Sequence, residues 1–110
     1  MTVLGKALSN KKEFVGTWVH VFEQDSADGA VFRPADGDIP LSRRPRERVE
    51  LCADGSAVLM MAGEDDRYVP QPAHWKEESG AVVVRDSRGA VRMRVIAHAP
   101  DRLVVKLRGD

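Results

Sequence analysis

Apolar and polar positions alternate with a period of two along much of the chain. In residues 91–95, valine and methionine alternate with two arginines, and residues 102–108 repeat the pattern with leucine and valine against arginine and lysine. Successive side chains of a β-strand point to opposite faces, so this pattern predicts strands with one dry and one solvated face. A slip of one residue would bury several charges, and we therefore expect a firmly set register.

Turn signals divide these apolar runs at regular intervals. Asp54-Gly55 stands between two of the runs, which is a strong local signal for a β-hairpin. Further turn sequences follow at Ser79-Gly80, 87–89 and 98–101. A spacing of about 8–12 residues is typical of an all-β sandwich or barrel. The strands predicted in this way cover residues 14–23, 47–53, 57–62, 73–78, 81–86, 90–97 and 102–108, with a short additional strand at 30–33.

A meander of about seven or eight strands avoids open edges most simply by closing on itself. We therefore predict an all-β fold, an antiparallel up-and-down barrel over residues 13–110, preceded by a tail or short helical turn at 1–12. Residues 24–46 form a long connection with several prolines and two Ala-Asp-Gly turns. Long connections in compact domains are often lids, so we expect this segment to cover a barrel mouth.

Composition narrows the functional classes. The chain has 110 residues, enough for one domain, and 43% of them are apolar. Lysine plus arginine equal aspartate plus glutamate at 17 each, and this balance argues against nucleic-acid binding and favours self-association. Cys52 is the single cysteine, and the sequence contains neither a signal-peptide pattern nor an apolar run long enough to span a membrane. We expect a cytoplasmic protein.

Several segments together resemble the lipocalins and their small bacterial lipocalin-like relatives. Gly16-Thr17-Trp18 is similar to the Gly-x-Trp signature of that family. The segments 49–60, 74–84 and 93–107 are similar to its later hairpins, so the resemblance extends over residues 13–108. It implies an up-and-down barrel whose first tryptophan packs under the barrel floor.

The same resemblance implies further roles. In the family that tryptophan stacks on an arginine near the chain end, a part that Arg102 or Arg108 could take. The family typically binds small hydrophobic molecules. For Gly16, we expect that the missing side chain allows close approach of another backbone.

These observations lead to a first functional hypothesis, an interior pocket for a small apolar or mixed-polarity ligand. It requires an interior void of about a few hundred Å³. His20 would be its polar group, able to orient a ligand or carry a proton. The predicted ligand-binding residues are His20, Phe22, Val58, Met60, Trp75, Val83, Met93, Val95 and Val105.

Other functions remain open. The first strand is apolar on both faces, so a homodimer could form through Val15, Val19 and Val21, or the domain could dock on a partner protein with its interior filled. An enzyme is the weakest hypothesis, and its candidate pair is His20 with Glu50 or Glu77. We expect neither metal nor cofactor, because the three histidines lack ligand spacing.

Four arginines in residues 43–48 raise a separate possibility. They could grip a phosphate or an acidic partner, although a solvated loop end is the more ordinary interpretation.

Overall fold

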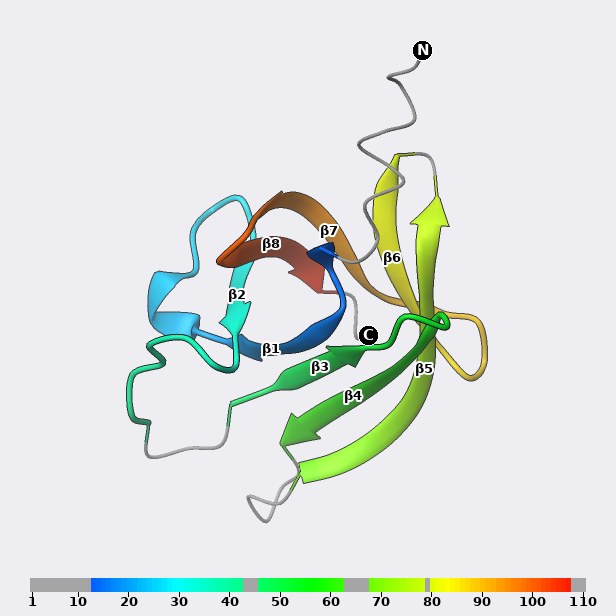
Figure 1. Ribbon diagram of the computed structural model, residues 1–110, viewed down its shortest axis with the longest axis horizontal. Coiled ribbons are helices and arrows are strands. Elements are labelled where there is room, and N and C mark those ends of the chain that lie inside the picture. Colours follow the sequence, from blue (N-terminus) through cyan, green and yellow to red (C-terminus); the bar gives the residue numbers. More distant parts are fainter. Residues whose placement is uncertain (1–12, 43–45, 63–67, 79, 108–110) are drawn as a thin grey trace.

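The structure, a computed structural model, describes residues 13–42, 46–62, 68–78 and 80–107 (Figure 1). Its elements are β1 (Gly16–His20), the short 3-10 helix η2 (Phe22–Gln24), β2 (Ala30–Pro34), β3 (Arg48–Leu51), β4 (Ser56–Ala62), β5 (Tyr68–Glu78), β6 (Ala81–Asp86), β7 (Val91–Ala99) and β8 (Arg102–Leu107). The strands close into an antiparallel barrel in the order β1-β2-β8-β7-β6-β5-β4-β3. The predicted all-β antiparallel barrel is confirmed. The predicted tail at 1–12 lies outside the described residues.

The strand order departs from a strand-by-strand meander at one place. β3 to β8 follow one another around the wall, but β1 lies between β2 and β3. β2 ends beside the start of β1, where Trp18 pairs with Pro34, and β3 begins beside the end of β1, where Val19 pairs with Arg48. Between β2 and β3 the chain therefore passes from one side of β1 to the other.

Part of the segment predicted as a lid is a wall of the barrel. Ala30–Pro34 forms β2, which pairs with β1 on one side and with β8 on the other. Its Val31 and Phe32 are buried, as expected for β-branched and aromatic residues in a covered strand. Without β2 the barrel would have two open edges, so a lid over the whole of 24–46 was a wrong prediction.

The first strand is shorter than predicted, because the chain turns away after His20. Residues Phe22–Gln24 form η2, in which the amide of Gln24 donates to the carbonyl of Val21 at 2.9 Å. The carboxylate of Asp25 then accepts the amide of Val31 at 2.9 Å and fixes the entry into β2. This compact turn lets the chain reverse direction between two paired strands.

The inward-facing side chains form one packed core. Alternation in β7 and β8 places Met93, Val95, Leu103 and Val105 inside, as predicted. The whole cluster consists of Phe14, Trp18, Ala30, Phe32, Val49, Leu51, Ala57, Leu59, Trp75, Val82, Val84, Met93, Val95, Leu103 and Val105. A small barrel of this kind is filled by its own side chains.

The outer face of β1 is also covered. Val19 and Val21 are buried within the chain, on the opposite side from Trp18 and His20. The predicted dimer surface is therefore not available at these two valines, whereas Val15 remains partly exposed.

Candidate functional site

Two indoles close the end of the barrel at which β1 begins, which we call the tryptophan end. Trp18 and Trp75 are each 4% exposed and belong to the core. The indole N–H of Trp18 donates to the carbonyl of Phe14 at 2.9 Å, and that of Trp75 donates to the carbonyl of Cys52 at 2.8 Å. Trp18 thus holds residues 13–15 at this barrel end, and Trp75 holds the β3–β4 turn there.

Gly16 begins β1 next to these rings. Its φ of +137° lies in the region that side chains rarely adopt. Among the described residues, no heavy atom outside the adjoining residues lies within 4 Å of the place a Cβ would take, so close approach of another backbone is not the reason for this glycine. The backbone angle is the reason, and it turns residues 13–15 back over the barrel end.

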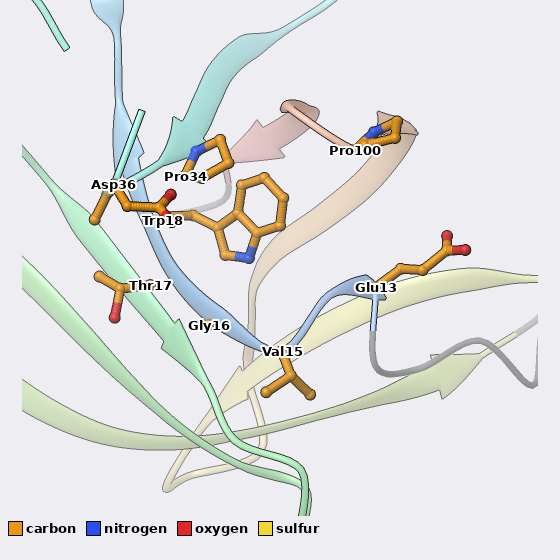
Figure 2. Close-up of a pocket in the computed structure, with 9 residues that line it drawn as sticks. Glu13, Val15, Gly16, Thr17, Trp18, Pro34, Asp36 and Pro100 are labelled. Carbon is orange, nitrogen blue, oxygen red and sulfur yellow. The ribbon is translucent and has the colours of Figure 1, made fainter. Parts of the chain in front are cut away.

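An open pocket of about 440 Å³ lies at the tryptophan end (Figure 2). Its walls come from the chain before β1, from β1 itself, from the turn after β2 and from the β7–β8 turn. The lining residues are Glu13, Val15, Gly16, Thr17, Trp18, Pro34, Ala35, Asp36 and Pro100. The indole of Trp18 lies between Pro34 and Pro100 in the view of Figure 2.

Backbone hydrogen bonds hold the pocket walls in place. The amide of Ala35 donates to the carbonyl of Thr17 at 2.9 Å, and the amide of Gly37 donates to the carbonyl of Pro34 at 2.9 Å. The second bond closes a β-turn that presents Ala35 and Asp36 at the rim. The wall is therefore preformed and does not need a ligand to order it.

The pocket combines apolar and acidic groups. Glu13 and Asp36 bring carboxylates and Thr17 a hydroxyl, beside the apolar surface of Val15 and the prolines. The Glu13 carboxylate lies 2.8 Å from Nε2 of His98 on β7, and this hydrogen bond ties the chain before β1 to that strand. Such a lining suits a small molecule with both apolar and polar parts.

The predicted interior residues lie in three different places. Trp75, Met93, Val95 and Val105 are packed in the core. On β4 and β6 the barrel core is formed by Ala57, Leu59, Val82 and Val84. Val58, Met60 and Val83 therefore lie on the other face of these strands, where Val83 is nevertheless fully buried. The sequence pattern predicted these strands correctly. Because both faces of each strand are apolar, the pattern could not show which face points into the barrel.

His20 and Phe22 lie at the opposite end of the barrel, which we call the histidine end. The His20 ring contacts the carboxylates of Asp25 and Glu47, and it stacks on Phe32. The pairing of His20 with Glu50 or Glu77 proposed for an enzyme is therefore not the one observed.

The two arginines expected near Trp18 are not both described. Arg102 is exposed and lies in a polar depression with Gln24, Arg33 and Asp101, whereas Arg108 lies outside the described residues. Arg46, from the arginine-rich segment, is buried and engaged by Glu23 and by backbone carbonyls. An anion-binding role is thus not open to Arg46, because its donors are already used within the chain.

The sequence analysis singled out Gly16 and Trp18 but not the pocket they line, because the turn residues Ala35, Asp36 and Pro100 complete it. The sequence predicted a turn at Pro34, Ala35 and Asp36. Nothing in the sequence showed that this turn lies beside Trp18. Among the described residues, no group of three or more histidine, cysteine or acidic side chains is arranged to hold a metal ion. The described part of the chain also has no helix of the length and apolarity needed to cross a membrane.

Comparison with known proteins gives no family assignment. No protein-family model, no curated protein and no solved structure matches this chain.

Proposed function

We propose that this protein binds a small molecule of mixed polarity in the open pocket at the tryptophan end. The observation that carries the proposal is the pocket itself, at about 440 Å³, with a hydrogen-bonded wall and Trp18 among its lining residues. Ordinary ligand pockets measure about 300–1,000 Å³ and combine apolar walls with a few polar groups. The carboxylates of Glu13 and Asp36 supply those polar groups here.

The packing of the interior supports this location over the barrel centre. A ligand cavity leaves accessible surface on its walls, yet Val49, Val84, Leu103 and Val105 are 0% exposed. The interior at these residues is filled by neighbouring side chains. The ligand hypothesis drawn from the sequence is therefore kept, with its site moved to the barrel end.

We also propose that the barrel is a small lipocalin-like domain. The closed antiparallel wall and the buried Trp18 after Gly16 support this assignment, whereas the position of β1 between β2 and β3 departs from the up-and-down order that the family resemblance implies. Binding of small hydrophobic molecules is typical of that family. A single cysteine in a chain of this size supports a reducing, cytoplasmic setting.

Two alanines in β-turns of the same sequence, Ala-Asp-Gly, allow a sharp test. Ala35 and Ala27 are both exposed, and each is the second residue of a β-turn. The turn with Ala35 is closed by the amide of Gly37, which donates to the carbonyl of Pro34. The turn with Ala27 is closed by the amide of Gly29, which donates to the carbonyl of Ser26. Only Ala35 lines the pocket. Ala35→Phe should fill the pocket, whereas Ala27→Phe changes the same kind of turn elsewhere.

The measurement is native mass spectrometry of freshly purified protein, together with titration of a neutral apolar dye such as Nile red. We expect a copurified ligand or dye binding in the wild type and in Ala27→Phe, and binding weakened about tenfold or more in Ala35→Phe. Equal binding by all three proteins would show that the ligand does not bind in the pocket lined by Ala35. A ligand-free dimer in all three would favour the alternative of a protein-interaction module.

A further inference from the structure

We propose that His20 is a proton-dependent latch that fastens the connections 21–29 and 35–47 to the histidine end of the barrel. The ring contacts one carboxylate from each connection. Its Nδ1 lies 2.9 Å from Oε1 of Glu47, and its Nε2 lies 3.0 Å from both carboxylate oxygens of Asp25. His20 therefore contacts both segments, which β2 separates in the sequence, and the ion pair of Arg46 with Glu23 links the same two segments beside it.

The hydrogen-bonding capacity of the ring fixes which form makes these contacts. A neutral imidazole carries one N–H and one lone pair, whereas an imidazolium carries two N–H groups. Both nitrogens of His20 face carboxylate oxygens at hydrogen-bonding distance. Only the doubly protonated ring can donate to both, and a neutral ring would turn a lone pair toward one of the anions.

The surrounding charges make that change costly. Arg46 binds the Glu23 carboxylate through two nitrogens, at 2.8 and 2.6 Å, and donates to the backbone carbonyl of His20 at 3.1 Å. Among the described residues, the charged groups in these contacts are the carboxylates of Glu23, Asp25 and Glu47 and the guanidinium of Arg46. Within this described set, a charged ring gives two cations for three carboxylates, and a neutral ring gives one cation for three.

The His20 ring is shielded from solvent, whereas the two carboxylates it contacts are partly exposed, with 36% of the Asp25 side chain and 32% of the Glu47 side chain accessible. The His20 side chain is 10% exposed and stacks on Phe32 with ring centroids 4.9 Å apart and planes 13° apart. Charges in such a site interact more strongly than they would in water. Loss of the second ring proton should therefore push Asp25 or Glu47 away and loosen the connection that carries it.

The direction of the pH effect follows from the contacts. The latch is closed while the ring is doubly protonated, and it opens as pH rises through the imidazole titration, which for histidines falls between about pH 5 and 8. Strong acid also opens it, because the carboxylates then lose their charge. Opening would uncover Phe32, a core residue, so the proton controls access to the barrel core from this end.

Two measurements on the wild-type protein test the latch. The first is the NMR titration of the His20 ring nitrogens from pH 5 to 8.5, which reports the second proton directly. The second is amide-exchange protection of residues 21–42 over the same range, corrected for intrinsic exchange. We expect protection to fall about tenfold as the second proton leaves, the size of one lost hydrogen bond to a charged group.

Three variants sharpen the assignment. His20→Gln should remove the pH dependence of protection, and Glu47→Gln should shift the loss of protection to lower pH, because one anion facing the ring is gone. His98→Gln is the matched control, since His98 contacts a single carboxylate, Glu13, on the exposed surface at the other end of the barrel. It should leave the profile of residues 21–42 as in the wild type.

Two results would overturn the proposal. One is a His20 ring that titrates without any change in protection of residues 21–42. The other is the same pH profile in the wild type and in Glu47→Gln. Should His20→Gln not fold, these two comparisons still decide the matter.

Discussion

At the residue scale, three identical tripeptides form similar turns, but the residues packed against each turn determine how well a substitution is tolerated there. Ala-Asp-Gly occurs at 27–29, 35–37 and 53–55, and each copy closes a β-turn through the glycine N–H. The turns at 27–29 and 35–37 differ in what stands next to them. A Cβ on Gly29 would overlap the backbone carbonyl oxygen of Val105 on β8, whereas a Cβ on Gly37 would lie 3.3 Å from the carbonyl oxygen of Pro34.

This contrast gives a paired prediction. Gly29→Ala should lower the free energy of unfolding by about 1–3 kcal/mol, because β2 and β8 must separate to admit the methyl group. Gly37→Ala should cost less than about 1 kcal/mol, since a small shift relieves its contact. Urea denaturation of both variants checks the pair. Equal losses of unfolding free energy in the two variants would show that the close contact between Gly29 and β8 does not make Gly29→Ala more destabilising.

The candidate pocket could be foreseen only in part at this scale. Gly16 and Trp18 stood out in the sequence, and both line the pocket. Ala35, Asp36 and Pro100 did not, because their only signal was a preference for turns. Which turn stands beside which strand depends on the barrel order, and that order is set by non-local pairing and not by local pattern.

At the element scale, alternation predicted strands well wherever one face is polar. β7 and β8 carry arginines or lysine on one side, and their inner face was assigned correctly. β4 and β6 have apolar residues on both sides, so the inner face was assigned wrongly there. β2 was seen as a short strand, but its place between β1 and β8 could not be read from five residues.

The β5–β6 hairpin carries a pH-dependent contact of its own. The Arg85 guanidinium donates to the Glu78 carboxylate at 2.9 and 2.8 Å, and these bonds hold the pKa of Glu78 below its usual range. A lowered pKa means that the contact stabilises the fold above the pKa of glutamate in the unfolded chain. The contribution is lost as pH falls through the lower, folded value.

Glu78→Gln should therefore be less stable than the wild type at pH 7, and the difference should disappear in acid. Thermal unfolding from pH 7 down to pH 2.5 measures it. Glu77→Gln, at the neighbouring position on the same strand, is the control and should track the wild type more closely. A deficit in Glu78→Gln that persists unchanged at the acid limit would contradict the ion-pair explanation, because the wild-type carboxylate is then uncharged.

At the scale of the whole molecule, closure of the wall depends on one short strand. β2 is the piece that joins β1 to β8, and without it the remaining strands form an open sheet. Phe32 belongs both to this connecting strand and to the hydrophobic core. It pairs with His20 on one side and Leu103 on the other, and its ring is 1% exposed inside the barrel.

Phe32→Ala should consequently act on the entire barrel and not on β2 alone. Removal of a buried phenylalanine ring costs about 3–5 kcal/mol, a large share of the 5–15 kcal/mol that holds a typical domain together. Because a closed wall has no edge at which to unfold piecemeal, amides in β4 and β5 should lose exchange protection together with those in β1 and β8. Val104→Ala, at a half-buried position on β8, serves as the control and should cost much less. If β4 and β5 kept their protection in Phe32→Ala while β1, β2 and β8 lost theirs, the β3–β8 meander would be stable by itself, and closure would not be what makes the barrel cooperative.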